Sequence, residues 1–279
     1  MHSRFLPSTF DNSKPVAIIA GKGIYPELVY DRLKSLHIPG RLIAFEGETA
    51  LTLLEKVPSA DQATVKVGQL GALLKALKNL GAGSAIMAGQ ITPKRLFKDL
   101  ALDLKATMLI ASLKMRNAET IFGAIAKEIE KKGIQMLDGR SFLDDQLAEE
   151  GIMVGKLKIK HCHVTHAIEI AQQMAHLNIG QGVVARKGTI LAVEGFEGTD
   201  AMLLRAGEFE ASDSFFIKTA KSNQDYRFDI PVFGLKTIEV MAEAGIHIVG
   251  LESHKTIILE KTKVLQEAKK HNITIFGYT

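Results

Sequence analysis

The sequence predicts an α/β protein with two domains: a Rossmann-like N-terminal domain over 1–144 and a second α/β domain with a mixed sheet over 145–279. In the first half, short apolar runs alternate with segments of helical periodicity, which is typical of a parallel sheet covered by helices. In the second half, a hairpin pattern indicates antiparallel pairing as well. A polar, turn-rich stretch near 140–150 indicates the boundary. Because ligands often bind where two domains meet, we expect the ligand cleft between them.

The expected strands of the first domain are short apolar runs, at 15–20, 41–45, 63–68, 84–89 and 134–137. The helices between them are predicted from apolar spacing, at 21–36, 49–57, 70–81 and 119–132. Pro26 falls in the first helical turn, where proline is tolerated. The leucines from Leu70 to Leu77 recur at i, i+3, i+4 and i+7, and Gly81 is placed to end their helix.

The second domain is expected to begin its regular structure with a helix near 164–177, followed by a hairpin over 183–194 that turns at Lys187–Gly188. The remaining expected strands are 215–218, 246–251, 256–260 and 273–276, and the remaining helices are 235–244 and 261–271. The stretch GFEGTDAMLLRA (195–206) is interpreted only as a polar segment.

Composition indicates an ordinary globular protein. Its 279 residues can bury two cores, with 46% hydrophobic and 24% charged residues. The net charge is +4, but basic and acidic residues are interspersed, and the chain has no Trp and only four Tyr. A nucleic-acid binder usually shows a clustered basic face with aromatic residues for stacking, so we expect no nucleic-acid partner. The mild basic excess fits an anionic ligand or an anionic membrane surface.

The compartment is indicated by three absences in the sequence. The single cysteine, Cys162, excludes an intrachain disulfide and fits a reducing compartment. The first 15 residues lack the apolar core of a signal peptide. No apolar run approaches the roughly 20 residues that cross a bilayer. We therefore expect a cytoplasmic protein, with peripheral contact as its one route to a membrane.

Two glycine-containing loops follow predicted strands. In AGKGIYP (20–26), Gly21 and Gly23 would let backbone N–H groups approach a phosphate at a helix N-terminus. Pro26 replaces the third glycine of the dinucleotide fingerprint, which favours phosphate or sugar contact over a nicotinamide cofactor; a tight turn without a ligand is an equal alternative. Gly89 in AGQITP (88–93) has the analogous position, so the two loops are expected to share a crevice.

The segment HCHVTHAIE (161–169) contains three histidines, with His163 and His166 three residues apart. A zinc site needs three or four converging ligands, and the chain has neither a C-x-x-C nor an H-E-x-x-H motif. A polar helix start is the better interpretation.

The densest group of reactive side chains lies between 194 and 229. Its members supply carboxylate, hydroxyl, amide and cationic groups, and are Glu194, Glu197, Thr199, Asp200, Lys218, Gln224, Asp225, Arg227 and Asp229. Hard oxygen ligands suit Mg²⁺, and the lysine and the arginine can neutralise phosphate charge in a transition state. If DYRFD (225–229) is extended, its three charges alternate onto one face and its two aromatic rings onto the other. An amphipathic edge strand with solvated ion pairs is the alternative.

Several of these motifs together resemble the UDP-2,3-diacylglucosamine diphosphatase family of the LpxI type. The resemblance extends over nearly the whole chain from about residue 14, and it rests on AGKGIYP, GQLGALLKALKNLG, MAGQITP, NIGQGVVARKGTILAVEGFEGTDAML and K-x6-QDYRFDIPVFGLKTIE. The acidic VE-x-x-EGTDAM and QD-x-R-x-D-x-P stretches are its most specific parts.

The resemblance implies a cytoplasmic enzyme of lipid A biosynthesis at the inner membrane surface. Such an enzyme hydrolyses UDP-2,3-diacylglucosamine to UMP and 2,3-diacylglucosamine 1-phosphate with Mg²⁺, and holds the lipid between its two domains. The essential aspartate of the family falls on Asp225, which would bind Mg²⁺ or activate water. Asp200, Glu197 and Asp229 would complete the carboxylate set, and Lys218 and Arg227 would stabilise charge on the diphosphate. The residues implied in substrate binding are Gly21, Gly23, Gly89, Thr199 and Gln224.

Two stretches depart from the family pattern, and one of them is HCHVTH (161–166), which lacks an acidic residue expected there. Members often show a G-D-D-like sequence before the helix near Glu119, where this chain has NAE at 117–119. Two other function classes stay open from the residues alone: an enzyme that uses the glycine loop for another nucleotide-sugar or a dinucleotide, and a non-catalytic nucleotide or lipid binder. The oligomeric state is also open, with a homodimer as one option.

Overall fold

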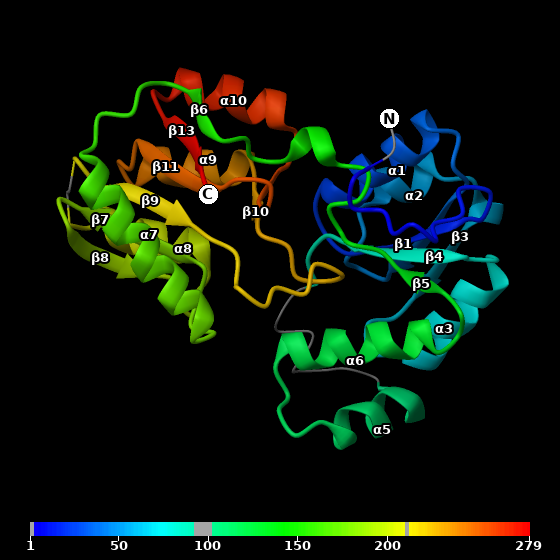
Figure 1. The fold of residues 1–279 in the computed structure, drawn as a ribbon. Coiled ribbons are helices and arrows are strands. Elements are labelled where there is room, and N and C mark those ends of the chain that lie inside the picture. The colour runs from blue at the N-terminus through cyan, green and yellow to red at the C-terminus, as the bar shows by residue number, and fades with distance from the viewer. Residues whose placement is uncertain (1–2, 92–101, 210–211) are drawn as a thin grey trace. The chain divides into compact units, whose positions relative to one another are not determined.

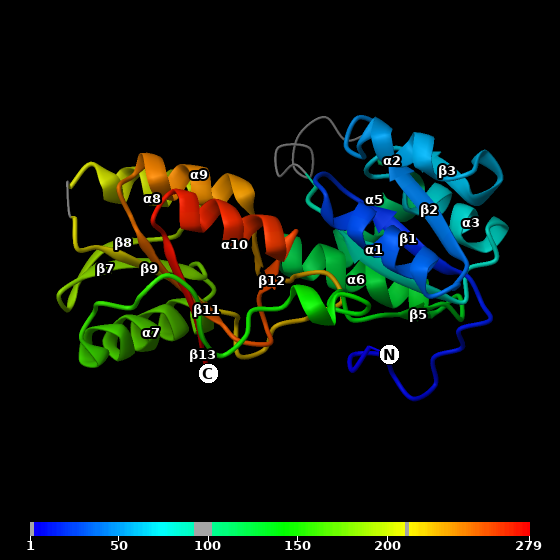
Figure 2. The same cartoon turned by 90° about the horizontal axis from the view of Figure 1, so that it is seen from above.

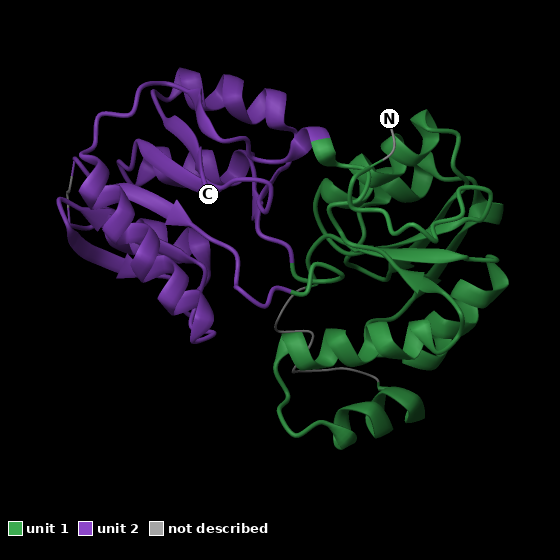
Figure 3. Ribbon diagram, in the orientation of Figure 1, with its two compact units in different colours: residues 1–144, 225–229 green, residues 145–224, 230–279 purple. Residues whose placement is uncertain are grey.

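A computed structural model describes residues 3–91, 102–209 and 212–279. The chain forms two compact units, each with its own sheet (Figure 3). Unit 1 consists of Met1–Asp144 and Asp225–Asp229, and unit 2 of Asp145–Gln224 and Ile230–Thr279. The first division, after Asp144, coincides with the boundary expected from the sequence. The short segment Asp225–Asp229 does not, because it packs in unit 1 instead of the second domain.

Unit 1 contains a five-stranded parallel sheet with the order β3-β2-β1-β4-β5. The strands are β1 (Val16–Ala20), β2 (Gly40–Phe45), β3 (Gln62–Val65), β4 (Ser84–Ala88) and β5 (Gln135–Met136). All five were predicted. The order reverses direction between β1 and β4, so the carboxyl ends of these two strands form the topological switch point at which α/β sheets commonly bind ligands.

Helices cover both faces of this sheet. They are α1 (Tyr25–Ser35), α2 (Leu51–Lys56), α3 (Leu70–Asn79), α5 (Leu104–Ser112) and α6 (Ala118–Glu130), with a short 3-10 turn at Ser59–Asp61. Figure 1 shows α1 and α2 on one face and α3, α5 and α6 on the other. The leucine stripe of α3 is buried against Ile19, Ile43 and Ala85 of the sheet, together with Ala126 and Ile129 of α6. Helix α5 was not predicted from the sequence.

Unit 2 contains a six-stranded sheet with the order β6-β13-β11-β9-β7-β8. The strands are β6 (Gly151–Val154), β7 (Gly182–Arg186), β8 (Thr189–Val193), β9 (Phe215–Lys218), β11 (Ile248–Glu252) and β13 (Thr274–Tyr278). β9, β11 and β13 are parallel, and the other pairs are antiparallel. The predicted mixed sheet is therefore confirmed. A two-stranded parallel sheet of β10 (Val232–Phe233) and β12 (Ile257–Ile258) accompanies it.

Four helices cover the sheet of unit 2, namely α7 (His161–His176), α8 (Thr199–Gly207), α9 (Leu235–Glu243) and α10 (Lys261–Lys270), and a 3-10 turn lies at Asp144–Gln146. Side chains alternate along β7: Val183 and Ala185 pack towards α7, whereas Val184 packs towards α8, α9 and α10. Figure 2 shows α7 on one side of this sheet and α8, α9 and α10 on the other. The predicted hairpin turn is confirmed at Lys187 and Gly188, both with positive φ.

Helix α8 corrects the interpretation of 195–206 as merely polar. Met202, Leu203 and Ala206 are buried in the core of unit 2, while its first turn keeps the polar side chains of Thr199 and Asp200. None of the helices in the described part of the chain combines the length and apolarity that a membrane crossing needs.

Candidate functional site

The two predicted glycine loops lie side by side at the switch point of unit 1. The N–H of Lys22 donates to the carbonyl of Gln90 at 2.7 Å, and the N–H of Gln90 donates back to Lys22 at 3.1 Å. Glycine is required for this approach, because a Cβ on Gly21 would lie 2.6 Å from the Gln90 carbonyl oxygen. A Cβ on Gly89 would lie 2.5 Å from that of Lys22. Residues 92–93 of the predicted second loop fall outside the described residues.

Replacing Gly89 by alanine should destabilise unit 1. The new Cβ meets backbone in a residue with φ of +87°, so strain and overlap add. We expect Gly89→Ala to lower the free energy of unfolding by about 2–4 kcal/mol in urea denaturation. Gly81→Ala is the matched control, since φ is +66° there but nothing lies within 4 Å of the added Cβ. An equal loss in both variants would show that contact between the loops contributes nothing.

The segment Asp225–Asp229 is held on unit 1 by its backbone and by an aromatic ring. The N–H of Gly139, in the loop that follows β5, donates to the carbonyl of Tyr226 at 2.7 Å. The ring of Phe228 stacks on Phe122 of α6 with 6.3 Å between centroids. These contacts explain why five residues flanked by unit 2 belong to the first core.

This segment is a turn, so the expected extended arrangement of 225–229 is wrong. The N–H groups of Phe228 and Asp229 donate to the carbonyl of Asp225, at 3.2 and 3.0 Å. The side chain of Asp225 also accepts the N–H of Arg227 at 3.2 Å. Aspartate commonly closes a turn in this way, by bonding to the backbone two residues on. As a result, Asp225 and Arg227 face each other instead of a common ligand surface.

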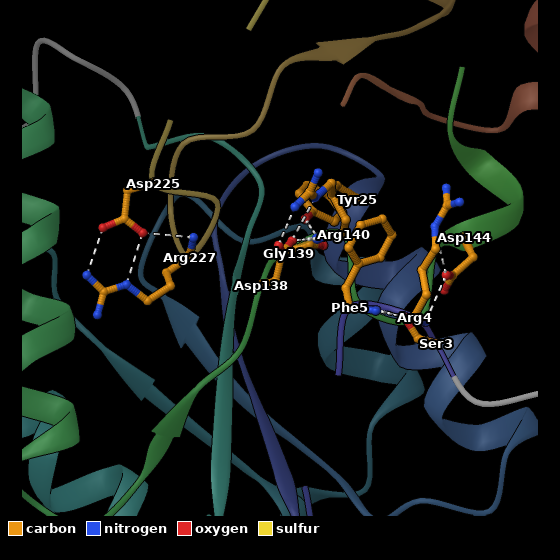
Figure 4. Close-up of polar contacts among 10 residues, drawn as sticks. All are labelled: Ser3, Arg4, Phe5, Tyr25, Asp138, Gly139, Arg140, Asp144, Asp225 and Arg227. Atoms are coloured by element: carbon orange, nitrogen blue, oxygen red, sulfur yellow. Dashed lines mark hydrogen bonds and ion pairs between the residues drawn. The ribbon is translucent and has the colours of Figure 1, made fainter. Parts of the chain in front are cut away.

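Asp225 and Arg227 form a bidentate ion pair (Figure 4). Nε of Arg227 lies 2.9 Å from Oδ1 of Asp225, and Nη2 lies 2.7 Å from Oδ2. The third nitrogen of the guanidinium, Nη1, lies 2.8 Å from Oε1 of Glu130 on α6. Hydrogen bonds from Arg227 hold the pKa of the Asp225 carboxyl below its usual range. Asp225 is therefore ionised at neutral pH and fixed in orientation, which suits a metal ligand or an anchor better than a strong base.

A second Asp-x-Arg pair, which the sequence reasoning missed, lies in the loop after β5. Asp138 accepts the N–H of Arg140 at 2.8 Å and its Nε and Nη2 at 3.0 and 2.6 Å (Figure 4). The Arg140 guanidinium lies 3.5 Å from the ring centroid of Tyr226. The hydroxyl of Tyr25, at the start of α1, donates to the carbonyl of Gly139. The signal was present in the sequence, since DGR at 138–140 repeats the spacing of DYR at 225–227.

Together these elements define the switch-point site of unit 1, formed by 21–24, 89–91, 138–140 and Asp225–Asp229. The first three loops follow β1, β4 and β5, which are adjacent in the sheet. The site therefore unites Gly21, Gly23, Gly89, Asp225, Arg227 and Asp229 of the predicted residues. The NAE sequence at 117–119, which departs from the family pattern, has a structural role, because Asn117 caps α6 by accepting the N–H of Thr120 at 2.9 Å.

Unit 2 holds the other predicted residues, and Lys218 is the most buried of them. Lys218 is the last residue of β9 and is 7% exposed. Nζ donates to Oγ1 of Thr199 at 3.1 Å, and Oγ1 donates to Oε1 of Glu194 at 2.7 Å. Among the described residues Lys218 forms no ion pair closer than 4 Å. A buried ammonium with only a hydroxyl partner is costly, so the arrangement points to an anionic ligand.

Glu197 and Asp200, the other predicted metal ligands, lie in separate surface ion pairs. Glu197 is 2.5 Å from Nη2 of Arg205, and Asp200 is 2.5 Å from Nζ of Lys236. Glu194, to which the sequence analysis assigned no role of its own, accepts the hydroxyl of Thr199. Gln224 accepts the N–H of Lys221 at 2.8 Å and thus shapes the chain just before Asp225.

A buried carboxylate at the end of β11 was not foreseen. Glu252 accepts the hydroxyl of Thr219 and the N–H of Ala220, both at 2.7 Å, and pairs with Lys255. It borders a cavity of about 560 Å³, which is also lined by polar residues of α7 such as Gln172. The position itself was the available signal, because the last residue of a parallel strand faces the ligand-binding edge of the sheet.

The predicted metal ligands do not meet in one place within either unit. Asp225 belongs to unit 1, whereas Glu197 and Asp200 belong to unit 2. Over the described ranges, no three His, Cys, Asp or Glu side chains are grouped closely enough to hold a metal ion. This includes the histidines of 161–169, which form the first turns of α7 as the helix-start interpretation predicted.

Unit 1 also contains an apolar cavity of about 70 Å³ between α3, α5 and α6. Leu73, Leu109 and Phe122 are among its lining residues. Phe122 joins the cavity to the switch-point site, because the same ring stacks on Phe228. The volume is well below the roughly 300–1,000 Å³ of ordinary ligand pockets.

Comparison with known proteins gives matches over nearly the whole chain. Residues 15–146 match the family model of the LpxI N-terminal domain, and residues 150–276 match that of the LpxI C-terminal domain. The UDP-2,3-diacylglucosamine pyrophosphatase LpxI of Caulobacter vibrioides is 27% identical over 238 residues, which cover 80% of this chain and 83% of that protein.

Proposed function

Because the chain belongs to the LpxI family, we propose that it hydrolyses the pyrophosphate bond of UDP-2,3-diacylglucosamine, giving UMP and 2,3-diacylglucosamine 1-phosphate for lipid A synthesis. The observation that supports this most directly is the state of Asp225. Its carboxylate is ionised, oriented by a bidentate arginine and placed at the ligand-binding edge of a parallel sheet. A residue in that state can bind a cation or orient water beside a diphosphate.

The roles we propose for the other residues follow from their charge and burial. Arg227 positions Asp225 and is itself held by Glu130. The glycine loops of the switch-point site allow close approach of a phosphate or a sugar. Lys218, with Thr199, is proposed to neutralise the charge that develops on the phosphoryl oxygens, since a desolvated ammonium acts strongly on such charge.

We propose Mg²⁺ as a partner of the substrate diphosphate. Mg²⁺ usually keeps several waters and is held by one or two carboxylates plus substrate phosphates, so a preformed three-carboxylate site is not required. Asp225 fits the part of the protein donor, because it is ionised and 29% of its side chain is exposed. When bound, the ion would supply charge neutralisation at the diphosphate.

The acyl chains of the proposed substrate need apolar surroundings, and the cavity behind Phe122 offers them beside the switch-point site. At about 70 Å³ the cavity has to widen before it can accept an acyl chain. A substrate of this kind resides in a bilayer, so we propose that the protein works in the cytoplasm at the inner membrane surface.

The test compares UMP release from UDP-2,3-diacylglucosamine and from UDP-glucosamine, with Mg²⁺ and with EDTA. We expect release from the diacylated substrate with Mg²⁺, a loss of at least about a hundredfold with EDTA, and little release without acyl chains. Equal rates on both substrates would refute the lipid specificity. Absence of release together with tight binding of NAD(H) would favour a dinucleotide enzyme instead.

A further inference from the structure

Exposed apolar side chains gather on one short stretch of unit 1. Of the twelve large hydrophobic residues that are exposed in the described part of the chain, four fall between 102 and 115. They are Leu102, Leu104, Met108 and Met115, with exposed fractions of 37%, 76%, 58% and 64%. Three of the four exceed half exposure. We call these four residues the α5 face, after the helix that they cover and flank.

Helix α5 has apolar residues on its inner side as well. Ala106 is its only buried residue, and Leu109 and Ile110 line the apolar cavity. Figure 1 shows α5 at the outside of unit 1, beside α6 and away from the sheet. A helix that is apolar on most sides is usually buried in a core or in a membrane. Helix α5 is neither a core helix nor an ordinary surface helix, because its outer side is apolar and yet exposed.

The stretch 102–116, which carries the α5 face, has more basic than acidic residues. It contains Lys105, Lys114 and Arg116 against a single acidic residue, Asp103, although Lys105 is paired with Glu128 of α6 at 3.7 Å. The Asp103 carboxylate is bonded to backbone. It caps α5 by accepting the N–H of Ala106 at 2.8 Å, and it accepts the N–H of Gly71 in α3 at 2.6 Å. Lys114 and Arg116 are exposed. An apolar surface with a basic margin fits an anionic lipid surface.

From these observations we infer that the α5 face docks on an anionic phospholipid bilayer. The inference rests on the proposed function, in which the diacylated substrate resides in a membrane. Methionine and leucine would enter the headgroup region, and Lys114 and Arg116 would lie among the phosphates. Leu102 of the α5 face also lines the apolar cavity, together with Leu109 and Ile110, which places the docking surface next to the proposed acyl site.

The first experiment measures sedimentation of the full-length protein with vesicles of phosphatidylcholine, alone or mixed with phosphatidylglycerol. We expect binding to the mixed vesicles that weakens as salt is raised. Leu104→Glu combined with Met108→Glu should reduce this binding at least about tenfold, because two apolar side chains no longer enter the lipid. Leu51→Glu is the matched control: it lies on α2, across the sheet, with 74% exposure, and should bind as the wild type does.

Activity separates this inference from the proposed function. The double variant should hydrolyse detergent-dispersed substrate at the wild-type rate but substrate in mixed vesicles at least about tenfold more slowly. Loss of both rates would count against the docking role, and so would unchanged vesicle binding in a variant that retains its fold by circular dichroism. A wild-type dimer in light scattering that the double variant converts to monomer, without any vesicle binding, would instead identify the α5 face as a contact between copies.

Lys114→Glu combined with Arg116→Glu should abolish the preference of the protein for vesicles that contain phosphatidylglycerol.

Discussion

Asp225→Asn should reduce kcat by at least about a hundredfold while the protein stays folded. Asparagine keeps the size of the side chain and can still accept the N–H of Arg227, so the turn is expected to survive. What disappears is the negative charge, and with it the ion pair to Arg227 and the proposed donor to Mg²⁺. The measurement is UMP release under saturating substrate, with the far-ultraviolet circular dichroism of the variant as the check on folding.

The pH dependence adds a second readout for Asp225. Because Arg227 lowers the pKa of this carboxyl in the folded protein, its stabilising contribution is present above the unfolded value and lost as the pH falls through the folded value. The Asp225 carboxylate should therefore stay ionised throughout the neutral range, so its titration should cause no fall in wild-type kcat there. Any fall in kcat on the acidic side of neutral pH should come from another group and should persist in Asp225→Asn. Near-normal turnover in the variant would exclude Asp225 from the chemistry.

Lys218→Met should also lower kcat by about a hundredfold, with a small effect on KM, since the proposed contact acts on charge in the transition state. The fold should tolerate the change. The strand position is buried and the ammonium has no ion pair closer than 4 Å in the described residues, so an apolar replacement of similar length also removes a desolvation cost. We expect the free energy of unfolding to change by no more than about 1 kcal/mol.

The control for Lys218→Met is Lys236→Met in the same unit. Lys236 is 78% exposed and pairs with Asp200 at the surface, so its removal should leave both kcat and stability nearly unchanged. If this variant lost activity as strongly as Lys218→Met, the surface pair of Lys236 and Asp200 would contribute to activity, and the effect of Lys218→Met would not be specific to its buried ammonium. If Lys218→Met unfolded the protein, the buried lysine would be structural and its catalytic role would fall.

Local patterns were enough to predict most of the two sheets. Runs such as 15–20 and 84–89 are apolar on both sides, as strands covered by helices must be, and the glycine loops after them were correctly placed together. Helix α5 could not be found in this way. Its sequence, LKATMLIAS, is apolar on most sides of the helix, so no single apolar stripe of helical period marks the segment.

The candidate site was harder to predict, because its geometry depends on hydrogen bonds that the alternation of charged and aromatic residues does not reveal. The alternation of 225–229 favoured a strand, but Asp225 bonds to the backbone and guanidinium of Arg227 and closes a turn instead. Its place in unit 1 depends on Phe122 and Gly139, which lie about a hundred residues earlier in the chain. No local pattern contains such contacts. A second Asp-x-Arg pair with the same geometry was the one clue in the sequence.

The central claim is that this chain cleaves the diphosphate of a diacylated UDP-sugar. Mass spectrometry of the products from UDP-2,3-diacylglucosamine and purified wild-type protein with Mg²⁺ tests it most directly. The account predicts UMP and 2,3-diacylglucosamine 1-phosphate in equal amounts, and at least about a hundredfold slower formation of both from Asp225→Asn under the same conditions. Release of UDP with a phosphate-free lipid, or recovery of intact substrate from the wild-type protein, would contradict it.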